Sequence, residues 1–404
     1  PTPSAPTTTG AGARDALRLR TLRSAVTGLI GYKPLHAASA AGLYLIHASQ
    51  RGDAADRVRA LGFHAHNQGL IAPASPRVNE MLARTVELAQ RDGRPEMIGF
   101  AELMQGTNAY HHETCGKARE HLERARKSLR ECTGVEWEHD ATNIYDQLSA
   151  LYAGDYAYIA RTTPSLLDQA VRKRRVWAAT MLSGFAGMQA WLTNDDVRGY
   201  RQKLNEARGL WQPGEDSGWP GMLLLYAEAL LAIYTGDPVR AFDTFAAEHA
   251  SARQTPISRM ALTGALGYAT HRGRCAAAAL GGARVPPEYR QQLVAALKES
   301  IGTLKRRGLV RSLGMGAMLE AALAAASGHD RKAIDELRAA ILQFDRAEAR
   351  MHAAAARRRL GQLTGGSEGR ELITAGETFM REQGVQELEP MTELNCPGFR
   401  QRIG

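Results

Sequence analysis

The side chains with the greatest capacity for chemistry lie between Tyr110 and Cys115, where His111, His112 and Glu113 are adjacent. These residue types can bind zinc or take part in proton transfer. Neighbouring residues on a helix point about 100° apart, so the two histidines would not face one ion. The pattern contains no HExxH motif, and no second cysteine is near. We therefore predict a partly exposed turn here, with no metal and no cofactor.

The motifs of nucleotide-dependent and acyl-transfer enzymes are absent from the sequence. The glycine-rich stretch 361–369 lacks the lysine of a phosphate-binding loop, and no predicted strand precedes it. Neither a kinase glycine loop nor an HRD, DFG or GxSxG motif occurs. An enzyme with a site scattered over the fold stays open as an alternative. The sequence itself predicts a chain without catalytic activity.

The composition indicates a helical globular protein. Its 404 residues are 44% hydrophobic and 23% charged, which excludes a wholly disordered chain. Alanine and leucine, both strong helix formers, are abundant, whereas β-branched residues are sparse. No apolar run reaches the roughly 20 residues of a membrane span. The four cysteines form no CxxC pair, so we expect a reducing, cytoplasmic setting.

The net charge of +9 is the one feature that suggests nucleic acid as a partner. The basic residues are spread along the chain, and the clusters at 172–175 and 357–359 lack interleaved aromatic residues. We predict that both clusters are solvated helix faces. A basic helical-repeat module that binds nucleic acid therefore remains an alternative, and nucleic acid is not the expected partner.

Helix-breaking turns recur at a steady spacing along the chain. Turns are predicted at Glu113, Gly154, Asn194 and Gly236, which are 41, 40 and 42 residues apart. Glycine ends one helix in the left-handed conformation, and a following aspartate caps the next. The spacing exceeds the roughly 34 residues of a standard tetratricopeptide repeat. We predict an all-α fold, an α-solenoid of degenerate tetratricopeptide-like hairpins of about 40 residues; an irregular helical domain is the alternative.

The predicted organisation is a linker over 1–13 and a single solenoid over 14–404. Within the solenoid we expect N-terminal hairpins over 14–93, central repeats over 94–250 and C-terminal repeats over 251–404. The Pro/Ser/Thr-rich start contains no signal peptide and no initiating methionine, so we expect a piece of a longer protein.

The turns also predict which side chains line the concave face. In such repeats the first helix of each hairpin faces inward, and positions about two, three, six and ten residues before each turn point into the groove. Large aromatic and methionine side chains there would suit a protein or peptide partner. The same side chains could instead form the core between hairpins, and periodicity does not separate the two. The candidates are Tyr110, His111, Tyr152, Met188, Trp191, Tyr226, Tyr234, Met315 and Met318.

The C-terminal part carries a family resemblance. It reads AAARRRLG over 354–361, GGSEGR over 365–370, FMREQGV over 379–385 and CPGF over 396–399. Together with CTGVEWE over 132–138, this resembles the tetratricopeptide-like tail of bacterial signalling proteins. Those proteins fuse a serine/threonine protein kinase and an AAA/STAND-type ATPase to such a tail. The resemblance implies that any kinase or ATPase chemistry lies upstream, because none of those motifs has matching positions here.

From these observations we expect a non-catalytic sensor or scaffold module. It would bind a protein or peptide on its concave face and contact the kinase and ATPase domains of its own parent protein. No membrane contact is expected. Binding would be coupled to the neighbouring domains through a change in superhelical pitch.

Overall fold

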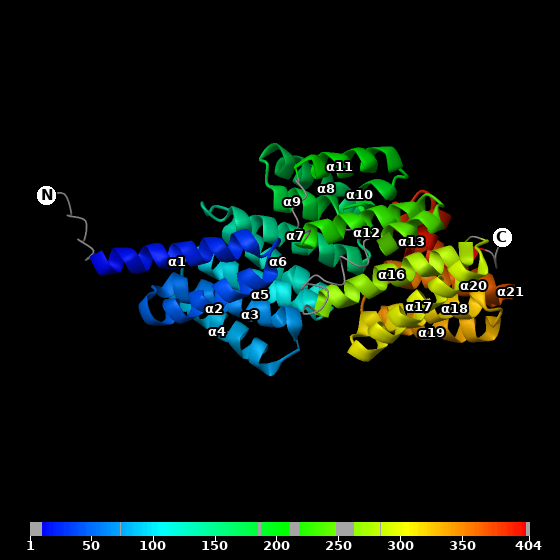
Figure 1. Ribbon diagram of the computed structural model, residues 1–404, viewed down its shortest axis with the longest axis horizontal. Coiled ribbons are helices and arrows are strands. Elements are labelled where there is room, and N and C mark those ends of the chain that lie inside the picture. Colours follow the sequence, from blue (N-terminus) through cyan, green and yellow to red (C-terminus); the bar gives the residue numbers. More distant parts are fainter. Residues whose placement is uncertain are drawn as a thin grey trace.

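The structure is a computed structural model that describes residues 10–72, 74–184, 187–210, 218–247, 262–282 and 284–400. Within these ranges the chain forms twenty helices and no strand. The helices pair into hairpins that stack into a superhelix (Figure 1), so the predicted all-α solenoid is confirmed.

Each hairpin consists of a first and a second helix. The first helices are α1 (Gly10–Leu29), α3 (Ala54–Ile71), α5 (Pro95–His111), α7 (Glu136–Ala153), α9 (Val176–Ser183) continued by α10 (Gln189–Leu192), α12 (Gly218–Tyr234), α16 (Leu262–Gly282), α18 (Val310–Ala326) and α20 (Arg350–Thr364). The second helices are α2 (Pro34–Arg51), α4 (Pro76–Asp92), α6 (Cys115–Leu129), α8 (Tyr156–Arg172), α11 (Val197–Leu210), α13 (Pro238–Ala247), α17 (Pro287–Arg307), α19 (Asp330–Arg346) and α21 (Gly366–Glu382). A last helix, α22 (Leu388–Asn395), follows the final hairpin.

The apolar pattern of the two kinds of helix decides their layer. Second helices such as α19 bury one stripe at alternating spacings of four and three residues, which is the pattern of a helix packed on one side. First helices such as α18 bury every position over 314–319, so they have neighbours all round. The first helices therefore form the inner layer and the second helices the outer layer. The buried stripe of α19 consists of Ala333, Leu337, Ala340 and Phe344.

The predicted turns are present. Gly154 has φ 76°, and the Asp155 carboxylate accepts a hydrogen bond from the Tyr158 backbone N–H at 3.2 Å. A side chain at Gly154 would also meet the Met351 backbone nitrogen at 2.6 Å, so both conformation and space require glycine. Glu113 adopts the same left-handed conformation with φ 62°, although a non-glycine residue is strained there.

The second turn of the superhelix packs directly against the first. First helices α3, α5, α7, α9 and α12 begin 41, 41, 40 and 42 residues apart. Contacts between successive superhelical turns join residues almost 200 positions apart: the Arg350 Nε–H donates to the Ala153 carbonyl at 3.1 Å, and the Arg311 N–H to Glu113 at 2.7 Å. One superhelical turn thus contains about five hairpins, and hairpins of the second turn lie directly on those of the first.

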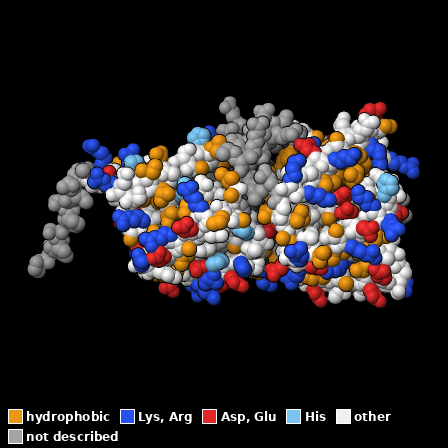
Figure 2. Space-filling model, turned by 90° about the horizontal axis from the view of Figure 1, so that it is seen from below, with side chains coloured by type: hydrophobic (Ala, Val, Ile, Leu, Met, Phe, Trp, Pro, Cys, Tyr) orange, Lys and Arg blue, Asp and Glu red, His pale blue; other side chains and the backbone are white. Residues whose placement is uncertain are grey.

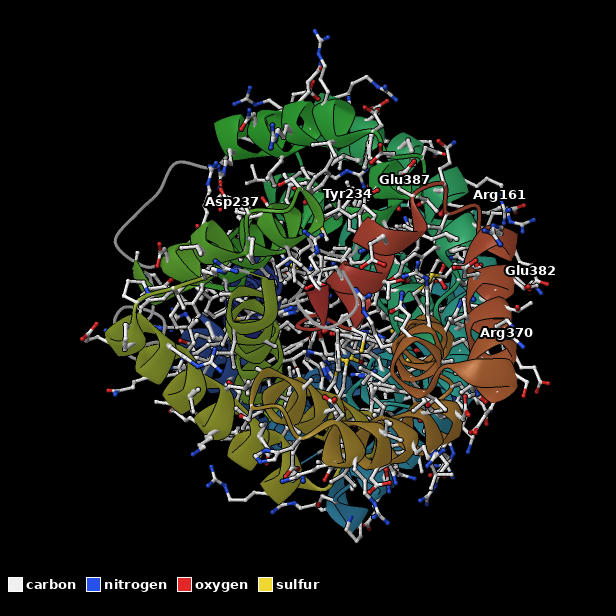
Figure 3. All side chains as sticks on the ribbon, turned by 90° about the vertical axis from the view of Figure 1, so that its right-hand side faces the viewer. Arg161, Tyr234, Asp237, Arg370, Glu382 and Glu387 are labelled. Atoms are coloured by element: carbon white, nitrogen blue, oxygen red, sulfur yellow. The ribbon has the colours of Figure 1, made fainter. Side chains whose placement is uncertain are left out.

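Helix α22 lies within the ring formed by the C-terminal hairpins (Figure 3), where it packs against α12 and α20. The Tyr156 hydroxyl donates to Asn395 at 3.0 Å, and the fully buried Arg359 pairs with Glu393 at 2.7 Å. Figure 3 shows Glu387, at the start of α22, and Tyr234 on the same side of this ring. Helix α22 therefore joins hairpins of both superhelical turns.

The hydrophobic core forms two clusters that meet in the middle of the chain. One holds residues from Leu19 to Ala141, the other residues from Tyr110 to Phe399, and Tyr145 packs against both. Helix α1 begins at Gly10, four residues before the expected start of the solenoid at 14. The linker residues 1–9 lie outside the described residues.

Candidate functional site

A partly open cavity of about 100 Å3 lies between the inner faces of the first helices α3, α5, α7, α9, α12 and α16. The turn after α1, at Ile30 and Gly31, covers one side. The cavity lies where the two core clusters meet. Its aromatic lining consists of Tyr110, Trp137, Tyr145, Tyr152, Trp177 and Tyr226.

The aromatic rings of the cavity are packed against one another. Trp137 and Trp177 are stacked, with centroids 6.1 Å apart and an interplanar angle of 7°. The Tyr226 ring lies 4.3 Å from that of His271, and Tyr110 meets Tyr145 edge-on at 5.4 Å. Aromatic contacts of this kind hold each ring in one orientation. The cavity therefore presents preformed ring surfaces to anything that enters it.

A small polar cluster interrupts this aromatic lining. The Thr107 hydroxyl donates its single proton to the Met104 carbonyl at 3.0 Å. It can therefore only accept in its contact with His66 Nδ1, at 3.3 Å. Nearby, the Tyr145 hydroxyl lies 3.5 Å from His111 Nε2. The other ring nitrogen of His111, Nδ1, is buried and has no hydrogen-bond partner.

Burial keeps these histidines neutral. Removal from water disfavours the charged imidazole, which lowers the pKa of His66 to about 4 and the pKa of His111 well below its usual value. His66 and His111 are only 6% and 4% exposed. Both rings therefore act as neutral hydrogen-bonding groups at physiological pH.

An ion pair beside the cavity joins the two superhelical turns. The Glu113 carboxylate accepts from the Arg311 backbone N–H at 2.7 Å and from the Ser312 hydroxyl at 3.1 Å, and it pairs with the Arg311 guanidinium at 3.4 Å. It thereby caps the N-terminus of α18. We call this cluster the latch and define it as Glu113, Arg311 and Ser312.

The latch touches the cavity through one aromatic ring. The Arg311 guanidinium lies 3.6 Å above the centroid of the Tyr152 ring, and Tyr152 also lines the cavity. A second cavity of about 40 Å3 adjoins the first and is lined by Tyr152, Glu113, Arg311 and Met315. Tyr152 therefore connects the cavity to the latch: a ligand that contacts this ring also contacts a residue that holds Arg311 in place.

The predicted concave-face residues divide into two groups. Tyr110, His111, Tyr152 and Tyr226 line the cavity, and Met315 lines its smaller neighbour. The others pack elsewhere: Met188 and Met318 are fully buried in the core. The Trp191 ring lies 6.0 Å from Tyr200, and the Tyr234 hydroxyl donates to the Leu192 carbonyl at 3.1 Å.

Sequence reasoning missed part of the lining. Trp137 and Trp177 are each the second residue of a first helix, and they lie 40 residues apart. This spacing of one repeat could have indicated that the two tryptophans occupy equivalent positions. The predicted inward-facing positions lay two to ten residues before each turn, and the starts of these helices lie farther from the turns. His66 and His271 had no comparable signal, because single histidines on buried helices are common in cores.

The polar clusters had different outcomes. The turn around Glu113 is partly exposed, as predicted: His112 is half-buried and Thr114 is exposed, whereas Glu113 is buried where it contacts the second superhelical turn. The cluster 357–359 was expected to be a solvated face, but Arg359 has no exposed surface. It lies on an inner helix, where it pairs with carboxylates of α22.

On the face shown in Figure 2, the basic residues do not gather into a patch, because Lys and Arg side chains are interspersed with Asp and Glu side chains. In the cluster 172–175, residues 172–174 are exposed but belong to the end of α8 and the following turn, and Arg175 pairs with Asp140 at 2.5 Å. No specific observation therefore favours a nucleic-acid interface.

Within the described ranges, no group of three or more His, Cys, Asp or Glu side chains is arranged to hold a metal ion. Nor does any helix in that part of the chain combine the length and apolarity needed to cross a membrane.

Comparison with models of known protein families finds no match, and no curated protein is significantly similar to the chain. The suspected family of the C-terminal tail stays a prediction. The residues that carry this resemblance have structural roles here. Arg359 of the AAARRRLG stretch binds α22, and the Gly281 backbone packs so closely against Gly398 of the CPGF stretch that a side chain at 281 would meet the Gly398 carbonyl at 2.0 Å.

Proposed function

We propose that this chain is a non-catalytic sensor module that binds part of a partner in the cavity between the inner faces of the first helices. The supporting observation is the cavity itself, which is preformed, aromatic and lined by six first helices. A cavity of this kind favours binding over chemistry, because its titratable side chains are neutral histidines and weakly acidic tyrosines. The partner is a protein or peptide that inserts a side chain, or a small molecule that takes the same place.

The proposed signal is a change in superhelical pitch. Tyr152 contacts both the cavity and Arg311, so an occupant that moves this ring shifts the latch. The latch holds α18 on the turn after α5, one superhelical turn earlier in the chain. Loosening of the latch would let the two superhelical turns separate. Small rotations between successive hairpins add up along a solenoid, so a small change at each hairpin is enough to change the pitch.

The proposed recipient of this signal is an upstream kinase or ATPase domain of the parent protein. This part of the proposal rests on the C-terminal sequence resemblance. In this arrangement the solenoid acts on domains of its own chain, and the enzymatic chemistry belongs to them.

Partner capture by substituted chains tests the proposal. Tyr226→Ala removes a cavity-lining ring, whereas Trp191→Ala removes a ring that lies outside the cavity. We expect partner recovery from cell extract, identified by mass spectrometry for both peptides and small molecules, to be lost only with Tyr226→Ala. Circular dichroism must show that both variants are folded.

Because Tyr226 is buried, a second variant guards against misfolding. Gly267 lines the cavity, and a Cβ placed there lies 3.8 Å from Tyr226, an ordinary contact distance. Gly267→Leu therefore fills the cavity without a clash at Cβ and raises helix propensity. Equal partner recovery by the wild-type chain, Tyr226→Ala and Gly267→Leu would contradict the proposed function.

A further inference from the structure

The chemistry of the cavity wall narrows what can enter it. Among the described residues that line it there is no Asp, Glu, Lys or Arg. A charged group buried there would lose its water without gaining an opposite charge, which is strongly unfavourable. The occupant must therefore be electrically neutral where it lies in the cavity.

The size and lining of the cavity favour a planar ring. Enclosed apolar cavities of about 150 Å3 hold a molecule the size of benzene. The present cavity, of about 100 Å3, is of the same order and presents ring faces from several sides. Aromatic groups stack on such faces or meet their edges with a gain beyond simple burial. A single aromatic ring fits these conditions better than a flexible aliphatic chain, which gains no ring contact.

The polar cluster adds one requirement. The Tyr145 hydroxyl lies 3.5 Å from His111 Nε2, and the greater acidity of the phenol favours Tyr145 as the donor. In this arrangement the neutral His111 ring carries its proton on Nδ1, a buried atom that has no hydrogen-bond partner. The Trp137 indole Nε1 is a second buried donor without a partner. Unsatisfied buried donors are costly, so a ligand that brings an oxygen acceptor gains by pairing with them.

We propose that the cavity binds a neutral aromatic ring that carries a hydroxyl or carbonyl oxygen. This inference rests on the proposed function and names the ligand chemistry of the same site. The ring stacks among the aromatic side chains, and its oxygen accepts a hydrogen bond from His111 Nδ1. Two sources supply this chemistry: a free phenol-type or aryl carbonyl metabolite, and the side chain of a tyrosine in a peptide partner.

The first experiment compares four one-ring probes on the purified chain by ligand-observed NMR titration. They are 4-methylphenol, toluene, 4-methylbenzoate and 4-methylbenzylamine, which share a ring and differ in oxygen and charge. We expect a dissociation constant on the order of 0.1–1 mM for 4-methylphenol, as is usual for so small a ligand. Toluene should bind about tenfold more weakly because it lacks an acceptor, and both charged probes at least tenfold more weakly.

Two pairs of measurements locate the site. Gly267→Leu should abolish binding of 4-methylphenol, whereas Gly302→Leu should leave it unchanged. Gly302 lies in the outer helix α17 with room for a side chain, so it controls for the same change elsewhere. His111→Phe should weaken 4-methylphenol about tenfold and leave toluene binding unchanged. Binding that survives Gly267→Leu, or a charged probe that binds most tightly, would overturn the inference.

A last comparison separates the two sources. A capped tripeptide with tyrosine between two glycines presents the same phenol on a peptide backbone. Binding at least tenfold tighter than 4-methylphenol assigns the site to a peptide partner, and binding of the free ring alone assigns it to a small molecule. Absence of binding by every ring probe at millimolar concentration would overturn the inference, while partner capture could still support the proposed function. Conversely, probe binding without partner capture would contradict only the function.

Discussion

Glu113 carries the clearest quantitative prediction of the structure, because one side chain joins two superhelical turns. Its carboxylate makes two hydrogen bonds to the start of α18 and an ion pair with Arg311. The side chains of Glu113 and Arg311 are 5% and 13% exposed. Both charges are therefore largely removed from water, and each depends on the other.

The expected cost of Glu113→Ala follows from this burial. Removing one partner of a buried ion pair costs about 3–5 kcal/mol, because the remaining charge is left uncompensated. Arg311 keeps its contact with the Tyr152 ring and slight exposure, so we expect the low end, about 3 kcal/mol. Glu113→Gly loses the same contacts but removes the left-handed strain of about 1 kcal/mol, so it should cost about 2 kcal/mol.

Urea unfolding followed by far-UV circular dichroism measures these differences. Arg174→Gly is the matched control: Arg174 has φ 51° in an exposed turn and joins no superhelical turns, so this change should stabilise the chain by about 1 kcal/mol. Arg311→Met combined with Glu113→Ala should cost less than the sum of the single changes by at least about 2 kcal/mol. Strictly additive effects, or a cost of Glu113→Ala below about 1 kcal/mol, would refute the latch.

Three further predictions concern other parts of the fold. The pKa of His66 is lowered by burial to about 4, whereas the unfolded chain titrates near its usual value of about 6.5. As the pH falls, the unfolded state binds the proton first, so the free energy of unfolding should decrease below about pH 6.5. For this residue alone we expect a decrease of about 2 kcal/mol at pH 5. Urea unfolding at several pH values should show this decrease, and His66→Phe should reduce it. Arg359→Leu leaves the buried Glu393 carboxylate, which is 2% exposed, with little compensating charge. We expect the free energy of unfolding to fall by about 3 kcal/mol and hydrogen exchange in α22 to become faster; unchanged exchange there would contradict this role of Arg359. Gly93 and Gly154 both have φ 76°, but only a Cβ at Gly154 would meet the Met351 backbone nitrogen. Gly93→Ala should therefore lower the free energy of unfolding by about 1 kcal/mol, and Gly154→Ala by at least about 2 kcal/mol more. Equal melting temperatures of the two variants would contradict the close contact at Gly154.

The local structure was predictable because its signals are local. The Gly-Asp turns at Gly154 and Gly236 fix where helices end and begin, since glycine adopts the left-handed conformation and aspartate accepts from the next helix. The apolar stripes of helices such as α19 predict one buried face. Together these patterns specify an all-helical array of hairpins, and they place Tyr110, Tyr152 and Tyr226 on first helices.

The long-range contacts were not predictable from these patterns. Whether an inward-pointing side chain lies in a groove or in the core depends on the superhelical pitch, which is the sum of small rotations between hairpins. Such rotations have no signature in the spacing of residues. A turn was predicted at Glu113, but only the contact with Arg311, 198 positions later, explains a glutamate at this strained position.

The sequence by itself thus determined the secondary structure, the turns and the layer to which each helix belongs, because these depend on neighbours within about one repeat. The tertiary structure decided the rest. It brought His66, His111 and Tyr145 into one cluster, stacked Trp137 on Trp177, and placed α22 inside the ring. The physical reason is that a cavity is formed by surfaces from distant hairpins, and their meeting depends on how closely successive superhelical turns pack.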